Sequence, residues 1–214
     1  MQKIKIVIAS QNVGKIREIK EILGEEYEVL GKKEMGIEQE IEESAKDFLG
    51  NARLKAVGIF EALKEKKDVL VLSDDSGICV DALDGMPGVY SARYASLDPL
   101  NVQEENDAIN RAHLISALQK KNLASSPARF VCAAVLYGNY QGRLINLHAQ
   151  GECLGVVHDY ERGEWGFGYD SLFEPLGMSQ RMAELSPHQK NQISHRFKAL
   201  YSLFEAWEKH KNLA

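Results

Sequence analysis

Apolar positions along the chain form two kinds of pattern, short continuous runs and stripes at helical spacing. The run from Ile4 to Ser10 is short and rich in β-branched residues, and it predicts a buried strand. Val13 to Leu23 repeats its apolar residues at helical spacing and predicts a helix. Val69 to Ser73 is another β-branched run and predicts a second strand. Because strands and helices alternate, we expect a mixed α/β fold with a largely central sheet.

The rest of the chain continues this alternation. Ser44 and Asp47 have the spacing of a capping box, and they predict the start of a long helix whose apolar stripe runs to Leu63. Further along, the pattern predicts a helix at 101–118, a hairpin of strands at 129–137 and 143–151 around a loop at 138–142, and a C-terminal helix from about 192 to 209.

Composition narrows the classes of protein that this chain can be. It has 214 residues, 44% of them hydrophobic and 27% charged, which excludes a disordered or fibrous chain. The 31 acidic residues outnumber the 26 basic ones, so the net charge of −5 argues against binding to a nucleic-acid polymer. No apolar stretch approaches the roughly 20 residues of a membrane span, and no targeting segment is seen. The three cysteines are far apart, so we expect a cytoplasmic protein without disulfides and no membrane partner.

A polar turn lies between the first strand and the first helix, from Ser10 to Lys15. A nucleotide-triphosphatase loop of the Walker type would need glycine at position 9 and serine or threonine at 16, but the chain has Ala9 and Ile16. What remains is a set of backbone amides and Lys15 at a helix N-terminus, which favours an anion. The alternative is an ordinary loop.

A second polar segment, from Ser73 to Gly77, is expected at the end of the second strand. Asp74 and Asp75 are adjacent acids, and burying both is costly unless they share a cation. Mg²⁺ is the usual cation, with Glu42 or Glu43 as a further oxygen ligand. The alternative is an acidic turn in which Asp74 caps a following element.

Several motifs in order along the chain resemble the inosine triphosphatase family, whose members are pyrophosphatases of non-standard purine nucleoside triphosphates. The matching segments are 9–15 (ASQNVGK), 48–56 (FLGNARLKA), 73–77 (SDDSG), 82–94 (ALDGMPGVYSARY), 166–170 (GFGYD), 184–186 (ELS) and 193–196 (ISHR).

The resemblance implies a fold and an activity. The fold is one domain over residues 1–214, with an elongated mixed sheet, flanking helices, and two lobes with a cleft between them. The activity is Mg²⁺-dependent hydrolysis of inosine, deoxyinosine and xanthosine triphosphates (ITP, dITP and XTP) to the monophosphate and pyrophosphate, which cleanses the nucleotide pool of the cytoplasm. The resemblance also implies a homodimer.

The resemblance implies roles for individual residues as well. Asp75 is the implied catalytic acid or base, and Glu42 and Asp75 are implied metal ligands, with Asp74 beside them. The implied phosphate turn is Ser10, Gln11, Asn12, Val13, Gly14 and Lys15. The other implied substrate contacts are Ser76, Phe167, Gly168, Tyr169, Asp170, Lys190, His195 and Arg196.

The residues themselves support parts of this assignment. Asn51 and Lys55 are one helical turn apart, so they share a face from which Lys55 could meet a phosphate or merely extend to water. Phe167 stands between two glycines, and it could stack on a base or close over the core. Arg196 can only donate hydrogen bonds, which favours bases with a 6-keto oxygen.

Geometry limits the C-terminal contacts. At helical spacing Lys190, His195 and Arg196 cannot meet one ligand unless the helix breaks near 191–194 or begins there. His195 could instead be a surface or capping residue.

The chain departs from the family pattern near the base loop. Trp165 stands where a glycine is common, Ser171 where a proline usually follows, and Gln189 where a glutamate is frequent. Since no charged ligand is lost, we expect these changes to affect base preference and not the reaction. Ser186 and Gln189 also form a capping box, with Pro187 at the first helical position.

Two other functions fit the residues. One is a pyrophosphatase of other modified nucleotides, like the Maf-type proteins. The other is a nucleotide-binding protein without turnover, although Glu42, Asp74 and Asp75 are all present.

Overall fold

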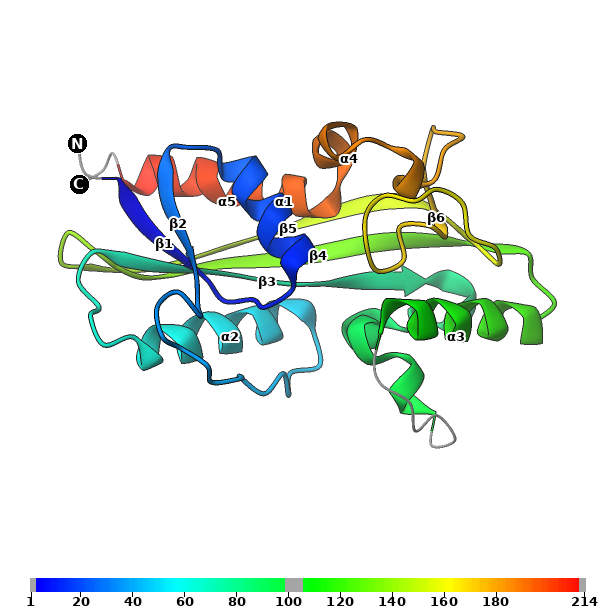
Figure 1. The fold of residues 1–214 in the computed structure, drawn as a ribbon, viewed down its shortest axis with the longest axis horizontal. Coiled ribbons are helices and arrows are strands. Elements are labelled where there is room, and N and C mark those ends of the chain that lie inside the picture. Colours follow the sequence, from blue (N-terminus) through cyan, green and yellow to red (C-terminus); the bar gives the residue numbers. More distant parts are fainter. Residues whose placement is uncertain (1–2, 99–105, 212–214) are drawn as a thin grey trace. The chain divides into compact units, whose positions relative to one another are not determined.

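The computed structural model describes residues 3–98 and 106–211 and contains a mixed six-stranded sheet in the order β2-β1-β3-β4-β5-β6 (Figure 1). The strands are β1 (Ile4–Ile8), β2 (Tyr27–Gly31), β3 (Val69–Val80), β4 (Ser125–Tyr140), β5 (Arg143–His158) and β6 (Phe173–Pro175). The α-helices are α1 (Val13–Leu23), α2 (Phe48–Ala62), α3 (Asp107–Lys120), α4 (Pro187–Ile193) and α5 (His195–Lys211). β1 pairs in parallel with β2 and β3, whereas β5 and β6 are antiparallel. The expected α/β fold with helices flanking a mixed sheet is confirmed.

The chain divides into two compact units. Unit 1 comprises Met1–Asp75, Cys132–Gly151 and Arg196–Ala214, and unit 2 comprises Ser76–Val131 and Glu152–His195. Strands β3, β4 and β5 contribute residues to both. The single domain and the cleft between lobes stay predictions.

In unit 1, alternating side chains of β1 build a core on each face of the sheet. Ile6 and Ile8 pack with apolar residues of α1 and α5, whereas Val7 packs with residues of α2. Figure 1 shows α1 and α5 on one side of these strands and α2 on the other. Because both faces are covered, the strand is apolar at successive positions and reads as a continuous run.

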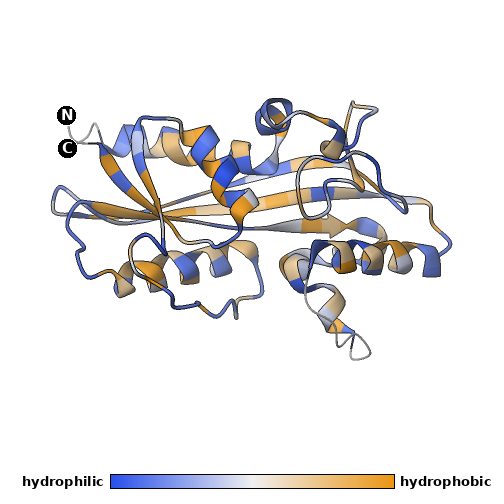
Figure 2. Cartoon of the chain, in the orientation of Figure 1, coloured by the Kyte–Doolittle hydropathy of each residue, from blue (hydrophilic) through white to orange (hydrophobic). Residues whose placement is uncertain are grey.

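Unit 2 has a core of its own. Leu114 and Leu118 of α3 lie in one buried cluster with Phe130 of β4 and Phe173 of β6. In Figure 2 the strands are mostly hydrophobic and the connecting loops mostly hydrophilic. Among the described residues, no helix combines the length and the apolar character needed to cross a membrane.

β3 is longer than the sequence predicts. It continues from Val69 through the polar residues 74–77 to Val80, so the expected end at Ser73 is wrong. Side chains alternate between the two faces of the sheet along β3. Leu70 and Leu72 face α1 and α5, whereas Val69 and Val71 face α2. The acidic residues that follow keep this alternation and meet different partners.

The hairpin of β4 and β5 is also longer than expected. It turns at Gln141 and Gly142, whose φ angles of 50° and 77° fit a primed two-residue turn. Gly138, expected in the loop, lies inside β4 with a φ of 152°. A Cβ atom there would lie 2.3 Å from the carbonyl oxygen of Val69, so this glycine permits a close approach of two strands.

The start of α2 differs from the prediction, whereas the start of α4 agrees with it. The expected start at Ser44 is wrong, because Asp47 is the N-cap of α2 and its carboxylate accepts a hydrogen bond from the Gly50 amide. The predicted capping box of Ser186 and Gln189 is confirmed at the start of α4. The break near 191–194 is also present, since Ser194 is extended between α4 and α5.

Other elements were predicted incompletely. Of the helix expected at 101–118, the structure shows α3 from Asp107, and residues 101–105 lie outside the described residues. β2 and β6, with five and three residues, were not predicted.

Candidate active site

The turn from β1 to α1 is held by its own side chains. Asn12 is the N-cap of α1, and its Oδ1 accepts a hydrogen bond from the Lys15 amide at 3.0 Å. The hydroxyl of Ser10 accepts a hydrogen bond from the Asn12 amide at 3.2 Å. The other residues of the turn are exposed or half-buried: Gln11, Val13 and Gly14. The turn thus presents Lys15 at a helix N-terminus, where the helix dipole favours negative charge.

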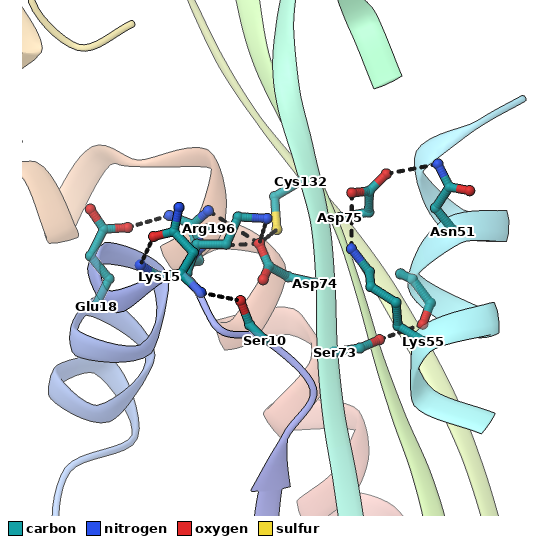
Figure 3. Close-up of polar contacts among 12 residues, drawn as sticks. Ser10, Lys15, Glu18, Asn51, Lys55, Ser73, Asp74, Asp75, Cys132 and Arg196 are labelled. Atoms are coloured by element: carbon teal, nitrogen blue, oxygen red, sulfur yellow. Dashed lines mark hydrogen bonds and ion pairs between the residues drawn. The ribbon is translucent and has the colours of Figure 1, made fainter. Parts of the chain in front are cut away.

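Asp74 lies in a cluster of charged groups in unit 1 (Figure 3). Its Oδ2 is 3.3 Å from Lys15 Nζ and 3.1 Å from Arg196 Nη2. The Nη1 of Arg196 donates a hydrogen bond to the buried Glu18. Burial alone would raise the pKa of Asp74, but Lys15 and Arg196 outweigh it and hold the pKa well below its usual range. Asp74 is therefore an ionised anchor for both cations.

Arg196 is only 1% exposed, and its guanidinium lies between Asp74 and Glu18. The role of Arg196 in recognising the base stays a prediction, and this geometry favours a structural role. Cys132 lies at the same cluster, with its Sγ 4.0 Å from Asp74 Oδ2. Burial, together with the charge of Asp74, raises the pKa of Cys132 to about 12, so the thiol stays protonated.

Asp75 lies on the other side of β3 (Figure 3). Its Oδ1 is 3.1 Å from Lys55 Nζ, and its Oδ2 accepts a hydrogen bond from Asn51 Nδ2 at 3.2 Å. Lys55 Nζ is also 3.3 Å from Glu43 Oε1. Burial is the largest influence and raises the pKa of Asp75, although Lys55 and Lys15 oppose it. A carboxylate with a raised pKa is a candidate general base.

The two adjacent acids pair with different cationic side chains, and their sharing of a metal ion stays a prediction. Successive side chains of a strand point to opposite faces, and Asp74 and Asp75 follow this rule. Asp74 pairs with Lys15 and Arg196, whereas Asp75 pairs with Lys55. Each charge is neutralised on its own face, which explains how both acids remain inside a buried strand.

A divalent metal fits the Asp75 side better than the Asp74 side. There, the Lys55 ammonium bridges the carboxylates of Asp75 and Glu43. These are hard oxygen donors, and Mg²⁺ commonly takes one or two carboxylates and completes its shell with water and phosphate. Within 3–98 and 106–211, no three His, Cys, Asp or Glu residues form a ready-made metal cluster. Glu42 is exposed, and Glu43 is the residue that reaches Lys55.

In unit 2, the segment from Gly166 to Asp170 forms a loop around Phe167. Gly166 and Gly168 have φ angles of 84° and 60°, which favour glycine. Asp170 Oδ2 accepts hydrogen bonds from the Phe167 amide at 2.9 Å and from Lys190 Nζ at 2.5 Å. Lys190 Nζ lies 4.5 Å from the centroid of the Phe167 ring. The structure therefore brings Phe167, Asp170 and Lys190 together, and their contact with a substrate stays a prediction.

Other predicted contacts have structural partners in unit 2. Tyr169 is buried, and its hydroxyl donates to the backbone carbonyl of Ser91 at 2.8 Å, so it anchors the loop from within the core. His195 is buried and stacks on Phe130 with ring centroids 4.8 Å apart, which excludes the alternative of a surface residue. Ser76 is half-buried in β3.

Three residues near these sites were missed in the sequence. Glu18 was available as an acid one turn after Lys15 on the helix, beside the apolar Ile19. Asp107 and Arg111 contact the backbone amide and carbonyl of Gly168, and their spacing of four places them on one helix face. Glu42 and Glu43 were alternative metal ligands in the sequence, and the structure distinguishes them because Glu43 contacts Lys55.

Comparison with known proteins identifies the family. The sequence model described as the Ham1 family matches residues 6–206. A dITP/XTP pyrophosphatase of Campylobacter jejuni is 44% identical over 199 residues, covering 92% of this chain and 94% of that protein. A dITP/XTP pyrophosphatase of Aquifex aeolicus is 42% identical, covering 94% and 95%. The solved structure of the Staphylococcus aureus Ham1 protein is 36% identical and has a TM-score of 0.77, covering 97% of this chain and 99% of that one. The resemblance seen in the motifs is confirmed, and the chain belongs to the Ham1 family.

Proposed function

We propose that this protein hydrolyses ITP, dITP and XTP to the corresponding monophosphate and pyrophosphate. The proposal rests on the environment of Asp75, a buried carboxylate whose pKa is raised and whose Oδ1 is 3.1 Å from Lys55 Nζ. The chain is also similar, over 92% of its length, to a protein named dITP/XTP pyrophosphatase.

The residues of unit 1 suit attack by water on a phosphate chain. Lys15 and the N-terminus of α1 bind phosphate oxygens, for which a helix N-terminus provides amide donors. Asp75 accepts the proton of the attacking water, and Lys55 and Asn51 hold its two oxygens in place. Such reactions need positioning and charge neutralisation more than covalent catalysis.

We assign Mg²⁺ to the side of β3 that carries Asp75, with Glu43 as the second carboxylate and Glu42 as the alternative. When bound, the ion neutralises the negative charge of the triphosphate. Asp74 on the opposite face acts as the anchor of Lys15 and Arg196. In unit 2, Phe167 is the proposed stacking platform for a purine ring. A homodimer and a cytoplasmic location remain expectations from the family resemblance.

The products of the reaction test the proposal. Cationic groups that hold a triphosphate suit attack of water at the α-phosphorus, so that an O–P bond forms there and intact pyrophosphate leaves. With Mg²⁺ and ITP, we expect pyrophosphate and the monophosphate in equal amounts. In water enriched in oxygen-18, the label should enter the monophosphate.

Other outcomes would contradict this assignment. Orthophosphate and the diphosphate as first products would overturn the site of attack. Faster turnover of pyrimidine or methylated nucleotides than of ITP would favour a Maf-like activity, and tight binding of ITP without turnover would favour a nucleotide-binding protein.

The choice between Glu43 and Glu42 can be tested by a matched pair of variants. Because Glu43 is the carboxylate that contacts Lys55, Glu43→Gln should raise the Mg²⁺ concentration for half-maximal activity by about tenfold or more. Glu42→Gln removes the same charge at an exposed neighbouring position and should change it by less than about twofold. The reverse order would assign the ligand to Glu42.

A further inference from the structure

The loop that carries Phe167 is held from outside by α3, through both backbone polar groups of one residue, Gly168. Asp107 Oδ2 accepts a hydrogen bond from the Gly168 amide at 2.7 Å. Arg111 Nη1 donates a hydrogen bond to the Gly168 carbonyl oxygen at 3.0 Å. Asp107 and Arg111 are one turn apart on α3, so a single helix face meets the residue that follows Phe167.

Arg111 is also connected, through Glu161, to Ser171, a residue that departs from the family pattern. Arg111 Nε donates to Glu161 Oε2 at 2.9 Å, and the hydroxyl of Ser171 donates to the same oxygen at 2.7 Å. Ser171 stands where the family usually has proline, which has neither a hydroxyl group nor an amide hydrogen. The loop is therefore held at Gly168 and again at Ser171 by one connected set of side chains.

These contacts meet a segment with two glycines, whose backbone has much conformational freedom. Gly166 and Gly168 flank Phe167 with positive φ angles, and glycine has the largest choice of backbone conformations. A Cβ atom on Gly168 would meet nothing within 4 Å, so packing around this residue does not restrict it. Asp170 holds the Phe167 amide, and hydrogen bonds to Asp107 and Arg111 hold the next residue.

We propose that Asp107 and Arg111 are positioning residues that fix the backbone of Gly168, and thereby the ring of Phe167, for the base of the substrate. The proposal rests on the proposed function, in which Phe167 stacks on the base. Neither residue touches the substrate. A ring held in place before binding loses less conformational freedom when the nucleotide arrives, so the effect falls on KM.

The first test needs no nucleotide. Amide hydrogen exchange at Gly168, followed by NMR, should be about tenfold faster in Asp107→Ala, because the hydrogen bond that protects it is lost. The Phe167 amide, which is held by Asp170, should change less and serves as an internal reference. Asp107→Asn keeps an oxygen acceptor and should restore most of the protection. Unchanged exchange at Gly168 in Asp107→Ala would overturn the proposal.

The second test measures the effect on substrate. Asp107→Ala and Arg111→Ala should raise KM for ITP by about five- to tenfold and change kcat by less than about twofold. Inhibition by inorganic tripolyphosphate, which lacks a base, should not change. Lys120→Ala, which removes an exposed cation from the same helix, is the control and should leave KM unaltered. Normal KM values alongside faster Gly168 exchange would overturn the role in substrate binding.

The two tests separate this inference from the proposed function. If the wild-type protein does not hydrolyse purine triphosphates, the proposed function fails, and the exchange experiment still decides whether α3 holds the loop.

Discussion

Replacement of Asp75 by asparagine should lower kcat for ITP by about a thousandfold, with little change in stability. Asparagine has the shape of aspartate, and its Oδ1 can still accept a hydrogen bond from Lys55. Only the hydrogen bond from Asn51 Nδ2 is lost, because that donor then faces a second donor. Asparagine cannot take the proton of the attacking water, and a positioned general base contributes about 10² to 10⁴ in rate. The measurement is steady-state turnover with pyrophosphate detection, together with a thermal melt of the same preparation.

Asp84→Asn is the matched control for this variant. Asp84 is exposed and has a φ of 53°, a left-handed conformation that asparagine tolerates well. The control makes the same chemical change and should retain full activity. If Asp75→Asn kept more than about a tenth of the wild-type rate, the lost barrier contribution would be under about 1.4 kcal/mol, too small for the proton acceptor of the reaction.

Arg196→Met should destabilise the protein strongly. The change removes the guanidinium that lies between Asp74 and Glu18 and leaves two carboxylates buried with less compensation. Breaking a buried ion pair by removing one partner costs about 3 to 5 kcal/mol. For a chain of this size, the melting temperature should fall by about 6 to 20 °C. Thermal unfolding followed by circular dichroism measures the loss.

Two further variants make this result specific. Arg143→Met removes an exposed arginine at the start of β5 and should cost less than about 0.5 kcal/mol. Combining Arg196→Met with Glu18→Met should recover part of the stability, because one of the two buried carboxylates is then gone.

The same variants decide whether Arg196 recognises the base. A structural role predicts similar proportional losses of turnover for ITP and ATP, together with the fall in melting temperature. If the melting temperature were unchanged and only ITP turnover fell, by about 2 to 4 kcal/mol in transition-state stabilisation, Arg196 would contact the 6-keto oxygen as the sequence suggested.

Local signals accounted for much of the fold. The apolar runs predicted β1 and the first part of β3, and helical spacing predicted α1, α2 and most of the C-terminal helix. The predicted strand ends were wrong where acidic residues or a glycine lie inside a strand, because such residues usually mark loops and turns. The acidic residues after Ser73 suggested a loop because their neutralising partners are distant in the sequence, and Gly138 suggested a turn because its close neighbour, Val69, lies on another strand.

By itself, the sequence determined the family, the kinds of side chain available for phosphate, metal and base, and most elements, because motifs and periodicity are local properties of a chain. It did not determine which charge meets which. Arg196 and Asp74 are 122 residues apart in the sequence, yet their side chains are hydrogen-bonded. Glu42 and Glu43 are adjacent, and of these two it is Glu43 that pairs with Lys55. The tertiary structure decided these pairings, because strand alternation sends Asp74 and Asp75 to opposite faces, and α1 and α5 cover one face whereas α2 covers the other.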